Sequence, residues 1–338
     1  MHSAYLRELE NNNYLSLIQR GLEWIQFESL LPSSGARVFI KPNLTFPTYR
    51  PGVMTSPEAI EAAILAIREY TPNIILGDAD SGGYNRFSMS EVYKETGIAD
   101  FAQRHGVSVV NLSDGPRKPV EFRYKRKNLK IELPTLLTDE IDLLVTMPVP
   151  KVHANTTVSL SFKNQWGCIP EPTDRLRLHP YLERVLVEVN KAVKSQVVIM
   201  DGKYGLNNNG PMLGDPVDLN WVMVTSDIGS AARIACELMQ IKLNEVKHLR
   251  YADRGYRLIP QLDEIALNQP LESFKKTKFV LKRKLTDYPG YLAFNSAFLA
   301  YIGYFSPLAG ILHKLLYLVR EPFYDYEQHK PNNVSTAK

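Results

Sequence analysis

The chain has 338 residues, of which 44% are hydrophobic and 22% are charged. That length allows one large or two ordinary domains, and the composition is that of a globular protein. The formal net charge of +4 is too small to indicate nucleic-acid binding. The two cysteines, Cys168 and Cys236, are too few for a disulfide framework or a cysteine-ligated cluster, which indicates a reducing, cytoplasmic environment.

The first 36 residues are predicted to be an N-terminal helical segment. Leu15, Ile18 and Leu22 give an apolar side to a helix expected over residues 4–31. The same residues are polar at the start and lack the apolar core of a signal peptide, so no signal peptide is expected.

Residues 37–242 alternate between predicted strands and helices. Short apolar runs predict strands at residues 37–40, 73–76, 107–112, 141–145, 196–200 and 221–225. Helices are predicted over residues 59–70, 90–96, 179–194 and 227–239, the first of them starting at Thr55-Ser56-Pro57. Residues 120–134 predict a hairpin at the sheet edge that turns at 126–128. This alternation predicts an α/β fold, in one or two lobes, with a mostly parallel sheet, helices on both faces and a ligand crevice at the carboxyl ends of the strands.

Five of the predicted strands end in polar residues. In a parallel sheet such ends lie on one edge, so residues far apart in sequence meet at one crevice. Loops between strands and helices are polar in any case, which is the alternative explanation. The residues at these ends are Lys41 and Asn43, Asp78 and Asp80, Lys151 and His153, Asp201, and Asp227.

The stretch from 143 to 167 is where we expect the chemistry. His153 is the best candidate for a general acid or base, because imidazole titrates near neutral pH. Lys151 and Lys163 are further candidate catalytic residues, and Lys41 can neutralise a phosphate or carboxylate. The alternatives are a hydrogen-bonded structural histidine and lysines that pair with nearby aspartates. The residues predicted to bind substrate are Lys41, Asn43, Ser81, Asn155, Thr156, Asn164, Asn208 and Gly210.

Four aspartates are candidate ligands of a divalent metal such as Mg²⁺, which prefers oxygen donors. They are Asp78, Asp80, Asp201 and Asp227. Asp80 and Asp227 equally fit helix N-caps. Gly77, Gly82 and Gly83 would allow the backbone to approach an anion, although they form no dinucleotide or phosphate-loop motif.

Several motifs resemble the family called domain of unknown function 362. They are VFIKPNL at 38–44, the threonine-serine-proline helix start at 55–57, GDADSGG at 77–83, KVHANTTVSLSFKNQWG at 151–167 and the DG…NNNGP…GDP run at 201–216. The resemblance spans residues 37–240 and implies an α/β fold but little about the reaction. Many relatives carry ferredoxin-type iron–sulfur segments, and two cysteines are too few for one.

This family is also distantly similar to lactate racemase-type proteins, which bind a nickel pincer cofactor on a lysine and use paired histidines. Only His153 stands in a matching context, with no second histidine at a predicted strand end, which argues against that cofactor here.

Residues 243–326 form an extension with a different character, predicted to be helical. A basic run at 275–284 precedes residues 289–312, which contain no charged residue. Pro307 divides this apolar stretch into two short helices, and tyrosines with the flanking Lys314 and Arg320 suit an anionic membrane interface. The alternatives are a membrane span and helices packed on the core or on a second subunit. Residues 327–338 are predicted to be a disordered tail.

Three classes of function remain open on these observations. The first is an enzyme that acts on an anionic, phosphorylated or lipid-linked small molecule by proton transfer or metal-assisted chemistry. The second is a ligand-binding or scaffold protein without turnover, and the third is a redox protein that depends on a separate electron-transfer partner. The expected location is the cytoplasm, with association at the inner face of a membrane as a further expectation and a homo-oligomer as another.

Overall fold

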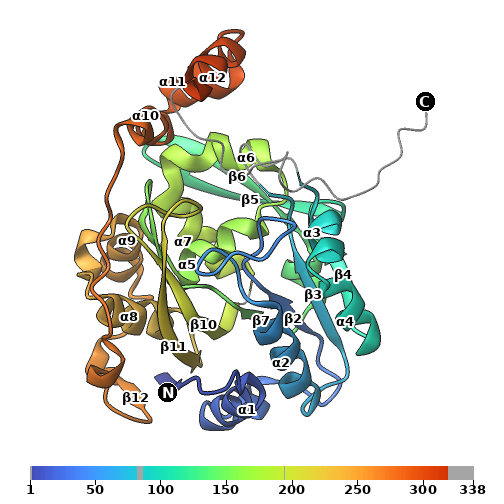
Figure 1. Ribbon diagram of the computed structural model, residues 1–338. Helices are drawn as coiled ribbons and strands as arrows, with labels where there is room; N and C mark the ends of the chain where they lie inside the picture. Colours follow the sequence, from blue (N-terminus) through green and yellow to red (C-terminus); the bar gives the residue numbers. More distant parts are fainter. Residues whose placement is uncertain (1, 82–86, 194, 319–338) are drawn as a thin grey trace.

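The computed structural model describes residues 2–81, 87–193 and 195–318. Gly82 and Gly83, Arg320 and the predicted tail from residue 327 onward lie outside the described residues. The described chain has a central sheet flanked by helices, with a helical segment standing off one end (Figure 1).

The central sheet is mixed and mostly parallel, which confirms the predicted fold class. From β10 to β4 every neighbouring pair is parallel, whereas β11 runs antiparallel to β10 and to β1. Two further short strands, β8 (Lys151–His153) and β9 (Thr157–Ser159), pair with each other, and β8 also pairs with β10. The order across the sheet is β12 (Ile265–Leu267), β1 (His2–Glu8), β11 (Asp215–Thr225), β10 (Ser195–Asn207), β7 (Leu143–Thr146), β2 (Val38–Lys41), β3 (Ile74–Asp78) and β4 (Ser108–Asn111).

Helices cover both faces because the inner strands are apolar on both sides. In β2, Val38 and Ile40 belong to one buried core, while Phe39 belongs to a core on the opposite face. One face carries α1 (Tyr14–Trp24), α2 (Pro57–Arg68), α3 (Met89–Glu95) and α4 (Ile98–Arg104). The other carries α5 (Ser161–Asn164), α6 (Pro172–Leu178), α7 (Leu182–Ala192), α8 (Ile228–Met239) and α9 (Lys247–Tyr256).

The predicted start of α2 is confirmed in detail. Pro57 lies in the first turn, and the Oγ of Ser56 accepts a hydrogen bond from the backbone N–H of Ala59 at 3.4 Å. A hydroxyl cap followed by proline is the arrangement that satisfies the unpaired N–H groups of a helix start.

The N-terminal prediction is wrong at its beginning. Residues 2–8 form strand β1, the α-helix spans only Tyr14–Trp24, and a short 3-10 helix follows at Phe27–Leu30. β1 lies between β11 and β12, and its Ala4 and Leu6 are buried in the same core as α8. Because both partner strands come from far along the chain, local periodicity could not reveal this pairing.

The strands predicted at 196–200 and 221–225 are parts of one long antiparallel hairpin. β10 continues through Asp201 as far as Asn207, and β11 returns so that Thr225 lies opposite Val198. Asp201 therefore lies in the middle of a strand. Asp227 follows a strand whose carboxyl end is at the opposite edge of the sheet from those of β2, β3, β7 and β10.

The predicted hairpin at 120–134 is confirmed as β5 (Arg117–Tyr124) and β6 (Lys127–Pro134). It forms a two-stranded sheet of its own rather than an edge of the central sheet. Lys125 and Arg126 make its turn with positive φ angles of 47° and 61°, as tight two-residue hairpin turns require.

The C-terminal extension is helical only in part. Its strand β12 joins the sheet beside β1, and Leu281 in the basic run bridges to Asn208 at the end of β10. The apolar stretch forms α10 (Tyr288–Asn295), α11 (Ala297–Ala300) and the π-helical turn η9 (Tyr301–Phe305), and after the break at Pro307 comes α12 (Ala309–Tyr317). Within residues 2–81, 87–193 and 195–318, no helix combines the length and the apolar composition that crossing a bilayer needs.

Candidate functional site

A cavity of about 260 Å³ lies where the predicted residues of several strand ends meet. Lys41 and Asn43 come from the end of β2, Asp78 and Ser81 from the end of β3, and Lys151 and His153 from β8. Lys163 and Asn164, which lie in the short helix α5, also line it. Asn155 and Gly210 complete the set of predicted residues that the structure brings together.

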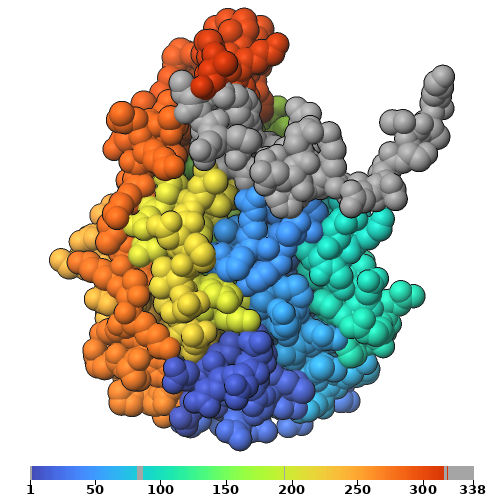
Figure 2. Space-filling model, in the orientation of Figure 1, coloured from blue at the N-terminus to red at the C-terminus, as the bar shows by residue number. Residues whose placement is uncertain are grey.

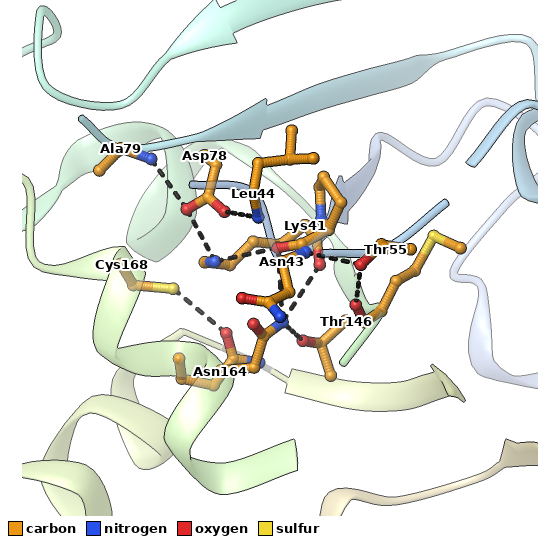
Figure 3. A network of polar contacts seen from close by, with 12 residues as sticks. Lys41, Asn43, Leu44, Thr55, Asp78, Ala79, Thr146, Asn164 and Cys168 are labelled. Atoms are coloured by element: carbon orange, nitrogen blue, oxygen red, sulfur yellow. Dashed lines mark hydrogen bonds and ion pairs between the residues drawn. The ribbon is translucent and has the colours of Figure 1, made fainter. Parts of the chain in front are cut away.

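Lys41 and Asp78, which both line this cavity, form an ion pair (Figure 3). Lys41 Nζ is 2.8 Å from Asp78 Oδ1, and the two side chains are only 1% and 5% exposed. The backbone N–H of Ala79 donates to the same carboxylate at 2.9 Å, and that of Leu44 at 3.4 Å. A charge this deeply buried needs such partners, so Asp78 serves to hold Lys41 in place.

Glycine and asparagine residues of the 151–167 motif pack against this pair. A Cβ at Gly167 would lie 2.7 Å from Asp78 Oδ1 and 2.8 Å from Lys41 Nζ, so only glycine lets the turn after α5 approach so closely. The Nδ2 of Asn164 donates to Thr146 Oγ1 at 2.7 Å, which links α5 to the end of β7 (Figure 3). Asn164 and Gly167 of the KNQWG sequence therefore allow α5 and the turn after it to pack against the ends of β2, β3 and β7.

Two lysines in the cavity have pKa values well below that of an ordinary lysine. Burial, and then the positive charge of Lys41, lower the pKa of Lys151 to about 7, although its Nζ donates to the carbonyl of Val53 at 2.7 Å. Lys163 is partly exposed, yet desolvation and then Arg175 lower its pKa to about 7 as well. Near neutral pH each amine is therefore divided between its charged and neutral forms.

His153 does not titrate near neutral pH, contrary to the prediction from the sequence. Burial and then the neighbouring Lys163 hold the pKa of His153 well below its usual range, so the imidazole is neutral at pH 7. Its Nδ1 is 3.1 Å from the backbone N–H of Asn155 and accepts that hydrogen bond, which places the ring proton on Nε2. The groups that titrate near neutrality are Lys151 and Lys163 instead.

The four predicted metal ligands are not gathered in one place. Asp80 Oδ1 accepts from the backbone N–H of Met89 at 2.7 Å, and Asp227 caps α8 through Ser230. Asp201 is buried and accepts from Tyr14 Oη and Ser56 Oγ, both at 2.8 Å. Only Asp78 lines the cavity, where Lys41 and backbone N–H groups occupy its oxygens, so the donor set predicted for Mg²⁺ does not fit. Across the described part of the chain no three His, Cys, Asp or Glu residues form a metal-binding group.

Two residues predicted to bind substrate also lie elsewhere. Thr156 donates from its Oγ1 to the carbonyl of Val158 at 2.9 Å, which closes the turn between β8 and β9. Asn208 hydrogen-bonds through its backbone to Val280 and Lys282 of the basic run. Neither lines the cavity.

Residues from two further parts of the chain, none of them predicted, also line the cavity. Arg175 of α6 is buried in the cavity wall, and its Nε has no hydrogen-bond partner among the described residues. His179, which follows the last residue of α6 and not a strand, also lines the cavity and is a second histidine near His153. Phe294 and Tyr304 come from the extension. The run at 172–179, which contains Arg175 and His179, could have indicated these residues. Its pattern is, however, also that of the start of an ordinary amphipathic helix.

These features define an α/β protein with a basic cavity at the carboxyl edge of a mostly parallel sheet. The model of the family described as a domain of unknown function (DUF362) matches residues 38–237, and the chain belongs to this family. The matched segment includes the basic cavity residues but not Phe294 or Tyr304.

Individual known proteins match more weakly. The thylakoid-associated protein sll1697 of Synechocystis sp. is 25% identical over 218 residues, which are 61% of this chain and 64% of that protein. The lactate racemase apoprotein of Thermoanaerobacterium thermosaccharolyticum superposes with a TM-score of 0.43 at 13% identity, covering 70% of this chain and 56% of its own. A Thermotoga maritima protein gives a TM-score of 0.43 at 16% identity, covering 67% and 59%. The chain thus spans less than two thirds of the length of each.

Proposed function

We propose that this protein is an enzyme that binds a small molecule with a carboxylate or phosphate group in the cavity and transfers a proton on it. The supporting observation is the pair of amines with a pKa of about 7, Lys151 and Lys163, in one cavity. An ordinary lysine is almost fully protonated at pH 7 and cannot accept a proton. Here one amine can act as the base while another remains a cation that holds the substrate.

Four polar side chains of the cavity have a role in this reaction. Neutral Lys151 accepts the proton from a substrate C–H group next to a carbonyl, and the electron pair left behind moves onto the carbonyl oxygen. The Nε2–H of His153 donates to that oxygen, as a neutral imidazole can. Lys163 and Arg175 hold the anionic group, and return of the proton completes an isomerisation. These steps use side chains of this chain and none passes through Mg²⁺ or a nickel cofactor.

Anion binding at pH 8 should be accompanied by proton uptake. Both lysines are mostly neutral at that pH in the free protein, and an anion favours their charged forms, so their pKa values rise on binding. Affinity should fall as pH rises above 7, by up to about tenfold per pH unit for each lysine, and change little below 7. Calorimetry of inorganic phosphate binding in buffers with different ionisation heats measures the uptake. Equal heats in all buffers would contradict the proposal.

The alternative function, a ligand-binding or scaffold protein, is distinguished by His153→Gln. Phosphate binding should largely survive this substitution under either function. Exchange of solvent deuterium into small carboxylates and phosphates, followed by proton NMR, should fall about a hundredfold only if the protein is an enzyme. If no compound exchanges in the unsubstituted protein although anions bind, the binding function is the better description.

The proposal includes a cytoplasmic location at a membrane surface. It is supported by the apolar, tyrosine-containing extension with basic residues beside it and by the thylakoid-associated relative. Fractionation of cells that express the tagged protein, with a high-salt wash of the membranes, tests this location. Recovery only in the supernatant before any salt wash would contradict it.

A further inference from the structure

The exposed apolar side chains of this protein are concentrated in residues 285–318 of its C-terminal extension. Outside residues 285–318, in the described part of the chain, only Trp24 and Val280 are large, apolar and exposed. Figure 2 shows residues 285–318, in orange and red, as a projection from one end of the molecule. The large apolar side chains exposed there are Leu285, Tyr288, Leu292, Phe298, Leu299, Tyr301, Leu308, Ile311, Leu312, Leu315 and Leu318.

The opposite side of the same segment forms a wall of the cavity. Phe294 of α10 and Tyr304 of η9 line it, with their rings stacked at a centroid distance of 5.4 Å. The ring of Phe294 also contacts that of His179, 4.1 Å away. The same short segment therefore presents apolar side chains both to the cavity and to the outside of the molecule.

The extension is tied firmly to the site by polar contacts. The Nε of Arg283 donates to the carbonyl of Ala154, next to His153, at 2.7 Å. The carboxylate of Asp287 accepts from Asn209 Nδ2 and from the backbone N–H of Lys284, both at 2.8 Å. The exposed apolar face is thus held at a fixed position beside the cavity.

The charge around this face matches an anionic lipid surface. No acidic residue occurs between Asp287 and Glu321, whereas Lys282, Lys284 and Lys314 are exposed beside or within the apolar set. Basic residues beside exposed leucine, phenylalanine and tyrosine are typical of interfacial association with anionic bilayers. A face that pairs with a second copy would bring these like charges together, which disfavours that occupant.

We infer that the extension docks on an anionic bilayer and that the substrate is an amphiphile whose anionic headgroup enters the basic cavity. The headgroup meets Lys151, Lys163 and Arg175, and its apolar chain leaves past Phe294 and Tyr304 toward the lipid. This inference rests on the proposed anion site and adds the substrate class. In this complex Phe294 and Tyr304 contact the apolar chain of the amphiphile and not its headgroup.

Vesicle flotation tests the docking surface. The protein should float with vesicles that contain phosphatidylglycerol and much less with phosphatidylcholine alone. Phe298→Gln with Ile311→Gln, at positions 71% and 59% exposed, should reduce flotation about tenfold or more, while the control Trp24→Gln, 43% exposed, should not. Equal flotation of the double variant overturns the inference. The inference is also overturned if sedimentation shows that the unsubstituted protein is a dimer and that the double variant is a monomer, because the face would then join two copies.

Binding of decyl phosphate, below its micelle concentration, tests the substrate class against inorganic phosphate. Each buried methylene strengthens binding about fourfold, so decyl phosphate should bind at least about tenfold more tightly. Phe294→Ala, or Tyr304→Ala if circular dichroism shows the first to be misfolded, should remove this advantage and leave inorganic phosphate binding unchanged. Equal binding of the two ligands overturns the substrate class but keeps the anion site. Failure of both to bind contradicts the proposed function itself.

Discussion

Replacing Asp78 with Asn should lower the free energy of unfolding by about 3–5 kcal/mol. The substitution keeps the size of the side chain but removes the negative charge 2.8 Å from Lys41 Nζ, where both side chains are almost completely buried. The ammonium group is then left without a counter-charge, and the amide cannot accept the backbone N–H groups of Ala79 and Leu44 as strongly. Urea unfolding followed by circular dichroism measures the loss.

The control is an ion pair with the same chemistry on the surface. Glu140 lies 3.7 Å from Arg37, with both side chains 44% exposed, and Glu140→Gln should change the unfolding free energy by less than about 1 kcal/mol. A second comparison uses the double variant Asp78→Asn with Lys41→Met. It should recover part of the lost stability, because neither member of the pair then carries a buried charge. If Asp78→Asn were as mild as Glu140→Gln, the pair would not be the buried anchor of the cavity.

Replacing Lys151 with Met should reduce proton exchange on the substrate about a thousandfold. Methionine has nearly the same length but no amine, so the base with a pKa near 7 is lost. Inorganic phosphate should still bind, more weakly, because Lys163 and Arg175 remain in the cavity. The number of protons taken up on phosphate binding at pH 8 should fall by up to about one, since one of the two titrating amines is gone.

The measurements are deuterium exchange by NMR and calorimetry with phosphate in two buffers. Lys94→Met, at a side chain that is 83% exposed on α3, is the matched control and should change neither result. Lys163→Met should weaken phosphate binding and also remove up to about one proton from the uptake. Unchanged exchange in Lys151→Met would show that the proton acceptor is another group. Unchanged uptake would show that Lys151 does not take up a proton when phosphate binds.

Part of the site follows from local sequence alone. The strands around Val38, Ile75 and Leu144 are short apolar runs that have to be buried, and polar residues follow each of them. Parallel strands bring those polar ends to one edge, so Lys41, Asp78 and Lys151 could be placed together without coordinates. The helix start at Ser56 and the hairpin at 117–134 likewise depend on neighbours in sequence.

The errors arose where strand direction or distant partners decide the outcome. Asp201 and Asp227 were assigned to the site edge because each follows an apolar run, but the antiparallel return of β11 places Asp227 at the other edge and Asp201 within β10. The strand β1 depends on partners contributed by β11 and β12. No property of residues 2–8 alone specifies either pairing.

The amino-acid sequence by itself determined the α/β class, the family and the set of basic residues at the strand ends, because these depend on patterns of a few consecutive residues. Only the tertiary structure decided which of those residues share a cavity, and that Lys151 and Lys163 rather than His153 titrate near neutral pH. It also brought Arg175, His179 and Phe294 to the same place. The physical reason is that a pKa and a cavity depend on burial and on charges from distant segments, which no local pattern contains.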